Sequence, residues 1–137
     1  MDSPQPDRKR HPFPWLLKLP IAAICLALLI WPWPGFFRQL RQDKLNNALL
    51  EAAHYRTAAD VQKALDQGAG ANTREPYGET ALMLAAFYGQ TDSVKLLLSR
   101  GAKVNLACEQ GETAFKWAAQ NKHFDTMALL RKAGEKQ

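Results

Sequence analysis

The sequence predicts an all-α protein, an α-solenoid of about three helix-turn-helix repeats preceded by a single transmembrane or signal-anchor helix. Two observations lead to this fold class. Residues of the same type recur every 33 positions through the last two-thirds of the chain, and a long apolar run precedes them. A fixed period of this length is typical of stacked repeats, whereas an apolar run of about 20 residues is typical of a helix that crosses a bilayer.

The predicted transmembrane anchor is residues 15–35, which follow a basic, proline-rich tail at residues 1–14. From Trp15 to Trp33 the sequence reads WLLKLPIAAICLALLIWPW. As a helix this stretch is about 27 Å long, close to the bilayer hydrocarbon thickness of roughly 30 Å. Tryptophans stand at both of its ends, where such rings prefer the headgroup level. Lys18 lies about one turn inside and can extend its amine outward.

Two other interpretations of this apolar segment stay open. A cleaved signal peptide also begins with basic and apolar residues, but here the bulky sequence WPWPGFF follows in place of the small residues of a cleavage site. A buried helix of the repeat domain is the second alternative. The short tail with Arg8, Lys9 and Arg10 favours an N-terminus in the cytoplasm. The lone thiol of Cys108 favours the opposite orientation, because unpaired cysteines are less common in oxidising compartments.

Charge is concentrated at the start of this 137-residue chain, whose formal net charge is +5. Residues 1–42 hold six Lys and Arg against two acidic residues, whereas residues 43–137 hold twelve basic against eleven acidic residues. Nucleic-acid binding needs basic residues clustered on the domain that docks. Because the repeat region is almost neutral, we expect no nucleic-acid partner.

The repeats themselves align without gaps. Gly68, Gly101 and Gly134 are equally spaced, and Thr80 and Thr113 keep the same interval of 33. The second repeat reads GETALMLAAFYGQTDSVKLLLSRGAKVN, the third reads GETAFKWAAQNKHFDTMALLRKAG, and the first reads NALLEAAHYRTAADVQKALDQGAGAN. These segments resemble the ankyrin repeat, through G-x-T-A-L-x-x-A-A, V-K-L-L-L and G-A-x-V-N. The resemblance implies an ankyrin-repeat domain at residues 36–137, with repeats at about 38–72, 73–105 and 106–137.

Local signals predict where the helices of each repeat begin and end. Thr80 and Thr113 are good N-caps for short helices that start at the next residue. In the first of these helices, Leu82, Ala85 and Ala86 are expected on one buried face. Gly101 follows the second helix where a left-handed residue is favoured. The predicted buried side of that second helix comprises Val94, Leu97 and Leu98.

Three departures from the family pattern stand out. TALM and TAFK replace the usual Thr-Pro-Leu-His, so Met83 stands where the family has a His and is expected to pack inside. Lys122 stands where the second repeat has Gly89, and holding a side chain left-handed there costs on the order of 1 kcal/mol. The first repeat lacks a connector, so its first helix is expected to begin upstream. The apolar stripe that predicts this extension is Phe37, Leu40, Leu45, Ala48, Leu49 and Ala52.

The resemblance also implies where a partner binds. In ankyrin-like stacks it meets the connector tips and the inner, concave face of the first helices. Tyr55, Tyr77, Phe87 and Tyr88 are predicted to form an aromatic patch there, the residue type that dominates binding hot spots. The alternatives are that Phe87 and Tyr88 fill a groove between repeats and that the glutamates are solvated loop charges. Transferred by position, the predicted partner-binding residues are His54, Tyr55, Pro76, Tyr77, Glu79, Phe87, Tyr88, Glu109, Gln110, Glu112, Gln120 and Asn121. Trp117 is expected in the core.

Catalytic and metal-binding patterns are missing from the sequence. Cys25 and Cys108 have no C-x-x-C partner and the histidines are scattered, so we expect no metal site and no cofactor. Glu51 and His54 lie three residues apart, but no nucleophile or phosphate-binding loop accompanies them. We therefore do not expect an enzyme.

Together these features predict a membrane-tethered protein-binding module that acts as an adaptor, inhibitor or protective subunit. Small bacterial ankyrin-like proteins with N-terminal export or anchor sequences look similar. That likeness implies the envelope of a Gram-negative bacterium, and the basic tail favours an inner membrane with the repeats facing the periplasm. One alternative is a soluble binder secreted after signal cleavage. Another is a membrane assembly element that oligomerises through its apolar helix.

Overall fold

The computed structural model describes residues 33–55 and 57–135 of the chain. Contacts divide the chain into two units, Met1–Arg38 and Gln39–Gln137. The predicted tail at residues 1–14 and the predicted anchor at residues 15–35 lie outside the described residues, except for the last three positions of the anchor. Within the described ranges, none of the helices combines the length and apolar character needed to cross a membrane.

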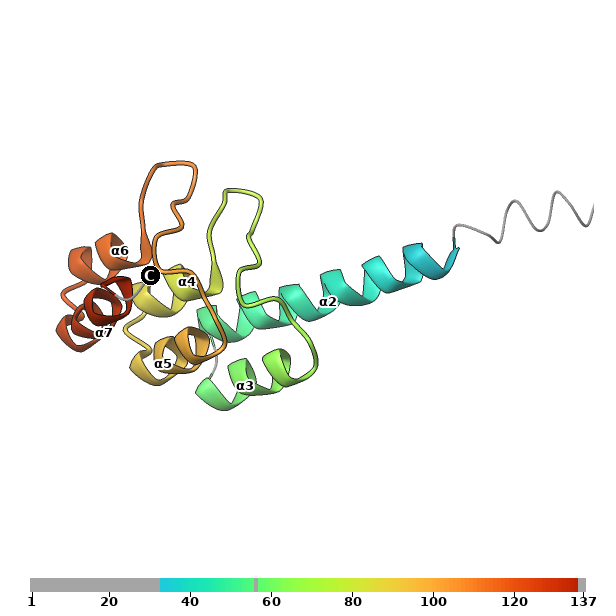
Figure 1. Cartoon of the computed structure of the whole chain (residues 1–137), viewed down its shortest axis with the longest axis horizontal. Coiled ribbons are helices and arrows are strands. Elements are labelled where there is room, and N and C mark those ends of the chain that lie inside the picture. Colours follow the sequence, from blue (N-terminus) through green and yellow to red (C-terminus); the bar gives the residue numbers. More distant parts are fainter. Residues whose placement is uncertain (1–32, 56, 136–137) are drawn as a thin grey trace, which may run out of the picture. The chain divides into compact units, whose positions relative to one another are not determined.

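The described residues are helical, as the sequence predicts, and contain no strand apart from two isolated bridges. Figure 1 shows the helices in chain order. Their bounds are α2 Trp33–Tyr55, α3 Ala58–Asp66, α4 Ala81–Phe87, α5 Thr91–Ser99, α6 Ala114–Gln120 and α7 Phe124–Gly134. Each repeat thus supplies a first helix (α2, α4 or α6) and a second helix (α3, α5 or α7).

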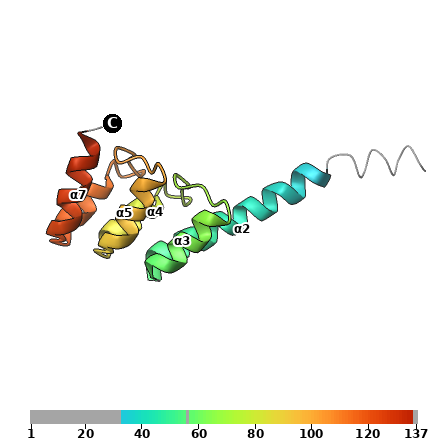
Figure 2. The same cartoon turned by 60° about the horizontal axis from the view of Figure 1, so that its bottom comes forward.

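Neighbouring repeats stack through like helices. The second helices α3, α5 and α7 contact one another in order (Figure 2). The first helices α4 and α6 also contact (Figure 1). The middle helix α4 is buried on all sides, since every residue from Ala81 to Ala86 is buried, including Met83 as predicted. The predicted burial of Leu82, Ala85 and Ala86 is confirmed, and the other three residues of this range are buried as well. A helix in the middle of the stack is covered by its own second helix and by both adjoining repeats.

The predicted caps and turns are confirmed. The hydroxyl oxygen of Thr80 accepts a hydrogen bond from the Met83 amide at 3.3 Å, and that of Thr113 accepts one from the Lys116 amide at 3.5 Å. Gly101 is left-handed, with φ of 83°. Lys122 is also left-handed, with φ of 59°, in the turn between α6 and α7. The third repeat therefore keeps the left-handed turn even though a residue with a side chain is strained in that conformation.

The first repeat uses a longer helix in place of a connector. Leu49 and Ala52 of α2 are buried as predicted, and Leu45 packs against the core. The prediction that this helix begins upstream is confirmed, since α2 starts at Trp33, and Phe37, Leu40 and Ala48 of the apolar stripe are exposed. Side chains of α2 reach the end of the repeat at Gln42, whose amide nitrogen donates to the Gly68 carbonyl at 2.9 Å, and at Asn46, whose oxygen accepts from the Gly70 amide at 3.0 Å.

Two connectors link the repeats, at residues 73–80 and 106–113, and they lie side by side (Figure 1). Each closes on itself through one isolated bridge, Arg74 with Thr80 and Ala107 with Thr113. They are joined to each other because the Glu109 amide donates to the Tyr77 carbonyl at 3.1 Å. The guanidinium of Arg74 also donates to the Ala107 carbonyl at 3.1 Å. The connectors are thus held at a defined spacing.

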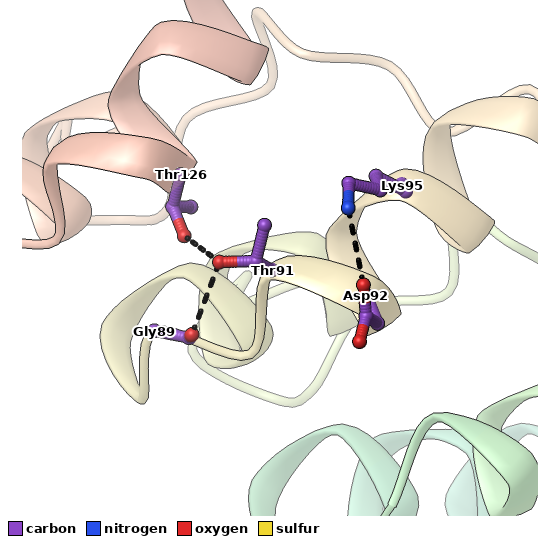
Figure 3. Close-up of polar contacts among 5 residues, drawn as sticks. All are labelled: Gly89, Thr91, Asp92, Lys95 and Thr126. Carbon is purple, nitrogen blue, oxygen red and sulfur yellow. Dashed lines mark hydrogen bonds and ion pairs between the residues drawn. The ribbon is translucent and has the colours of Figure 1, made fainter.

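A polar contact fixes the starts of α5 and α7 (Figure 3). The Thr91 hydroxyl donates to the Gly89 carbonyl at 3.4 Å and lies 3.2 Å from the Thr126 hydroxyl. Because a hydroxyl has one proton to give, Thr126 is the donor to Thr91. Thr126 is fully buried, so this hydrogen bond satisfies a polar group inside the interface between the repeats.

Candidate functional site

The predicted partner-binding residues lie at the two ends of the first helices. Pro76, Tyr77 and Glu79 belong to the first connector, which leads into α4. Phe87 and Tyr88 lie at the opposite end of α4, just before its turn into α5. The third repeat places its residues in the same way, with Glu109, Gln110 and Glu112 on its connector and Gln120 and Asn121 at the end of α6. We call the surface made by the connectors and the first helices the first-helix face.

A row of ring contacts runs across this face from repeat to repeat. The His54 ring lies 3.6 Å from that of Tyr55 and 4.9 Å from that of Tyr88, measured between centroids. The Tyr88 and Phe87 rings are 5.0 Å apart, and Phe87 lies 5.7 Å from Trp117. All four contacts are edge-to-face, the arrangement that aromatic quadrupoles favour. We call these five side chains the aromatic row.

Members of the aromatic row are only partly covered. Tyr55 is 78% exposed, Tyr88 is 42% exposed and Phe87 is 39% exposed. The sequence left open whether Phe87 and Tyr88 fill a groove between repeats or face outward. In the structure each of them does both, because Phe87 contacts Trp117 of the third repeat, Tyr88 contacts His54 of the first, and part of each ring meets solvent.

The connector residue Tyr77 stands apart from the aromatic row. Its side chain is 63% exposed and makes no ring contact with another described residue. Three of the four aromatic residues expected to form a patch are therefore brought together, and the fourth is placed at the connector tip. The first-helix face presents aromatic side chains at both ends of the first helices.

Glu112 and Trp117 form a polar pair that sequence reasoning missed. The Trp117 indole N–H donates to one carboxylate oxygen of Glu112 at 2.7 Å, and the Gln120 side-chain amide donates to the other at 2.9 Å. Trp117 was expected in the core, but it is only partly buried and packs against the core's edge. An indole N–H needs an acceptor when it is half-buried, and a glutamate five positions earlier was the available signal.

A groove of about 490 Å³ lies between the C-terminal end of α2 and the first connector. It brings together four of the predicted residues, which are His54, Tyr55, Pro76 and Glu79. The buried side chains of Leu50 and Leu84 lie at its base. The other lining residues are Asn47, Glu51, Arg74 and Glu75. The groove lies on the first-helix face, beside the aromatic row.

Comparison with known protein families identifies the family to which these repeats belong. The family model for ankyrin repeats, in three copies, matches residues 42–137. The chain belongs to the ankyrin-repeat family. No curated protein matches it with significant similarity. Ankyrin repeats are protein-protein interaction modules, and the chain therefore carries such a module in its last two-thirds.

The structure shows where the side chains that depart from the family pattern lie. Met83 is buried where the family places a histidine, and Lys116 is exposed at the same position of the third repeat. The threonine cap works without that histidine, because its hydroxyl oxygen still accepts from the backbone amide three residues on. His123 instead contacts the neighbouring repeat, with Nε2 at 2.9 Å from the Phe87 carbonyl oxygen.

Nothing in the described part of the chain is arranged to hold a metal ion, since no three His, Cys, Asp or Glu side chains gather there. The Cys108 thiol is buried in the second connector. Glu51 and His54 both line the groove, but His54 Nε2 is occupied by the Tyr88 hydroxyl at 2.8 Å.

Proposed function

We propose that this ankyrin-repeat module binds a protein partner through its first-helix face and is tethered to a membrane by residues 15–35. The observation that carries the binding proposal is the aromatic row, because it exposes ring surface from all three repeats on one continuous face. Aromatic side chains bury much apolar area at low conformational cost, which makes them common anchors of interfaces.

The rigidity of this face also supports binding. Neighbouring repeats are joined there through His54 with Tyr88 and through His123 with the Phe87 carbonyl. The connectors are joined through the Glu109 amide and the Tyr77 carbonyl. A surface that is ordered before binding loses less entropy when a partner docks. Binding without catalysis suits an adaptor, an inhibitor or a protective subunit.

Membrane tethering is supported by the sequence of the segment that precedes the repeats. Its apolar run is bracketed by tryptophans and lacks a small-residue cleavage site. We place the protein in a bacterial inner membrane with the repeats in the periplasm. A tag after Gln137 should then be digested by protease added to spheroplasts, and a tag before Met1 should be protected. A mature N-terminus beyond about residue 33 would instead establish the secreted alternative.

The binding proposal is tested by affinity capture from detergent-solubilised membranes. The informative variant replaces Tyr77, Phe87 and Tyr88 with alanine. It should lose the captured partner while keeping the wild-type circular dichroism spectrum. A matched control replaces Phe124, an exposed ring on the second helix α7 and outside this face, with alanine. It should keep the partner. Equal capture by both variants would show that the first-helix face does not bind.

The assembly alternative predicts a different outcome. If the apolar helix drives oligomerisation and the repeats only cap it, self-association survives deletion of residues 43–137. Chemical crosslinking in membranes, comparing the full chain with this deletion, separates the two functions. We expect the deletion to abolish partner capture.

A further inference from the structure

The groove between α2 and the first connector is acidic. Glu51 projects from α2, and Glu75 and Glu79 project from the connector, so three carboxylates line one cavity of about 490 Å³. Arg74 is the one Lys or Arg among the lining residues. The groove is therefore net negative, although the chain as a whole carries a formal charge of +5.

These three carboxylates have no ion pair or side-chain hydrogen bond with any residue that the structure describes. The ion pairs lie elsewhere, with Asp66 pairing with Arg100 and Asp92 pairing with Lys95. The third-repeat carboxylate Glu112 is likewise occupied, by Trp117 and Gln120. The groove thus holds three negative charges that no described residue neutralises through an ion pair.

The contact that holds the Arg74 side chain is not with the three carboxylates of the groove. Its guanidinium donates to the Ala107 carbonyl at 3.1 Å, which belongs to the next connector. His54 is similarly engaged with the Tyr88 hydroxyl. Neither of these residues forms an ion pair with the three glutamates.

The other walls of the groove suit a long cationic side chain. Buried Leu50 and Leu84 give an apolar base for an aliphatic stem. The exposed ring of Tyr55 stands at the edge, where a guanidinium or an ammonium is attracted to an aromatic face. An arginine or lysine combines that stem with a charged head, which the three carboxylates would surround.

We propose that this groove binds an arginine or lysine side chain from an extended basic segment of the protein partner. The inference rests on the proposed function, since it assigns the chemistry of the partner at that same face. Charge complementarity between the acidic groove and a basic segment selects this occupant. Because the carboxylates are partly exposed, added salt screens the attraction and weakens binding.

The test uses the full chain in a non-ionic detergent and a fluorescent peptide, Gly-Leu-Arg-Lys-Leu-Gly. Binding is measured by fluorescence anisotropy, beside a matched peptide in which glutamine replaces the arginine and lysine. The variant Glu51→Gln, Glu75→Gln and Glu79→Gln should weaken binding of the basic peptide about tenfold, since each exposed charge pair contributes a small part. It should not change binding of the glutamine peptide.

A matched charge control separates the groove from the net charge. Asp43→Asn, Asp125→Asn and Glu135→Gln remove the same number of carboxylates at positions that do not line the groove. This variant should bind the basic peptide within about twofold of the wild type. Equal weakening by both triple variants, or no preference for the basic peptide, would overturn the proposal.

The basic tail at residues 1–14 has the chemistry of the proposed ligand and serves as a further test. If its deletion raises affinity for the basic peptide tenfold or more, the chain's own tail is the occupant and the proposal of a partner segment is overturned. Partner capture distinguishes the two levels of inference. Loss of capture in the Tyr77, Phe87 and Tyr88 variant but not in the glutamine variant would refute only the acidic groove. Unchanged capture in both would refute the first-helix face itself.

Discussion

The Tyr88 hydroxyl lies 2.8 Å from Nε2 of His54, and this contact joins the first helices of the first two repeats near their C-terminal ends. The two rings also meet edge-to-face, at 4.9 Å between centroids. Both side chains belong to the surface proposed to meet a partner. Residues proposed to contact a partner therefore also hold neighbouring repeats together. Substitutions on this face should affect the stability of the fold as well as binding.

Tyr88→Phe tests this dual role. The substitution removes the hydroxyl and keeps the ring, so it should lower the free energy of unfolding by about 0.5–1 kcal/mol, the net contribution of a typical hydrogen bond. Urea denaturation of the full chain in detergent, followed by circular dichroism, measures the change. Tyr55→Phe is the matched control, because Tyr55 is 78% exposed and should give no change. Equal losses in both variants would mean that the bond to His54 contributes nothing.

The threonine pair at the starts of α5 and α7 predicts a coupled effect. Thr126→Val removes the donor to Thr91 inside a buried interface and should cost about 1–2 kcal/mol. Thr91→Val should cost about 1 kcal/mol and leave the Thr126 hydroxyl without its acceptor. The double variant should lose less than the sum of the two, by about 0.5 kcal/mol or more. Strict additivity in urea denaturation would show that the hydroxyls do not interact.

The sequence predicts the features that depend on a few adjacent residues. Thr80 and Thr113 cap helices because a hydroxyl and the amide three residues later are close in any helix start. The left-handed turn at Lys122 follows from its place one period after Gly89. Such signals are local and repeat with the chain, so they are legible without the structure.

Features that depend on neighbours far along the chain were harder to predict. The full burial of α4 follows from the repeats on both sides of it, which a single helix pattern does not reveal. The stripe through Phe37 and Leu40 predicted the upstream extension of α2, but apolar spacing does not reveal which of its residues are buried. The Trp117 contact with Glu112 crosses from a helix to a connector. The proposed binding residues remain a prediction.

The stack should depend on each layer of the core. Leu97 is fully buried in α5, between the repeats on either side, and Leu97→Ala should cost about 2–5 kcal/mol through lost contacts and the cavity left behind. In a three-repeat array each repeat is stabilised mainly by its neighbours, so the whole module should unfold at lower urea. Leu40→Ala is the control, since Leu40 is 41% exposed and should change stability by less than about 0.5 kcal/mol. A small effect at Leu97 would contradict a shared core.

The turn at Lys122 offers a stabilising substitution. Its φ of 59° is strained for a side chain by about 1–2 kcal/mol, whereas glycine adopts it freely at the price of a more flexible unfolded chain. Lys122→Gly should therefore raise stability by about 0.5–1 kcal/mol. Lys116→Gly makes the same chemical change inside helix α6 and should lower stability by about 1 kcal/mol. Urea denaturation that gives a loss at both sites would contradict the strained turn.

The converse substitution, Gly89→Ala, should be destabilising for two reasons. Gly89 has φ of 65°, which a side chain adopts at a cost of about 1–2 kcal/mol. A methyl group there would also lie 2.5 Å from Nδ1 and 2.8 Å from Cγ of His123, whose Nε2 contacts the Phe87 carbonyl. His123 must move and give up that contact, so the total loss should be about 2–3 kcal/mol. Gly101→Ala separates the two causes, because Gly101 is left-handed but has open space around it. It should lose only the backbone part, and equal losses at both glycines would exclude a steric role for His123.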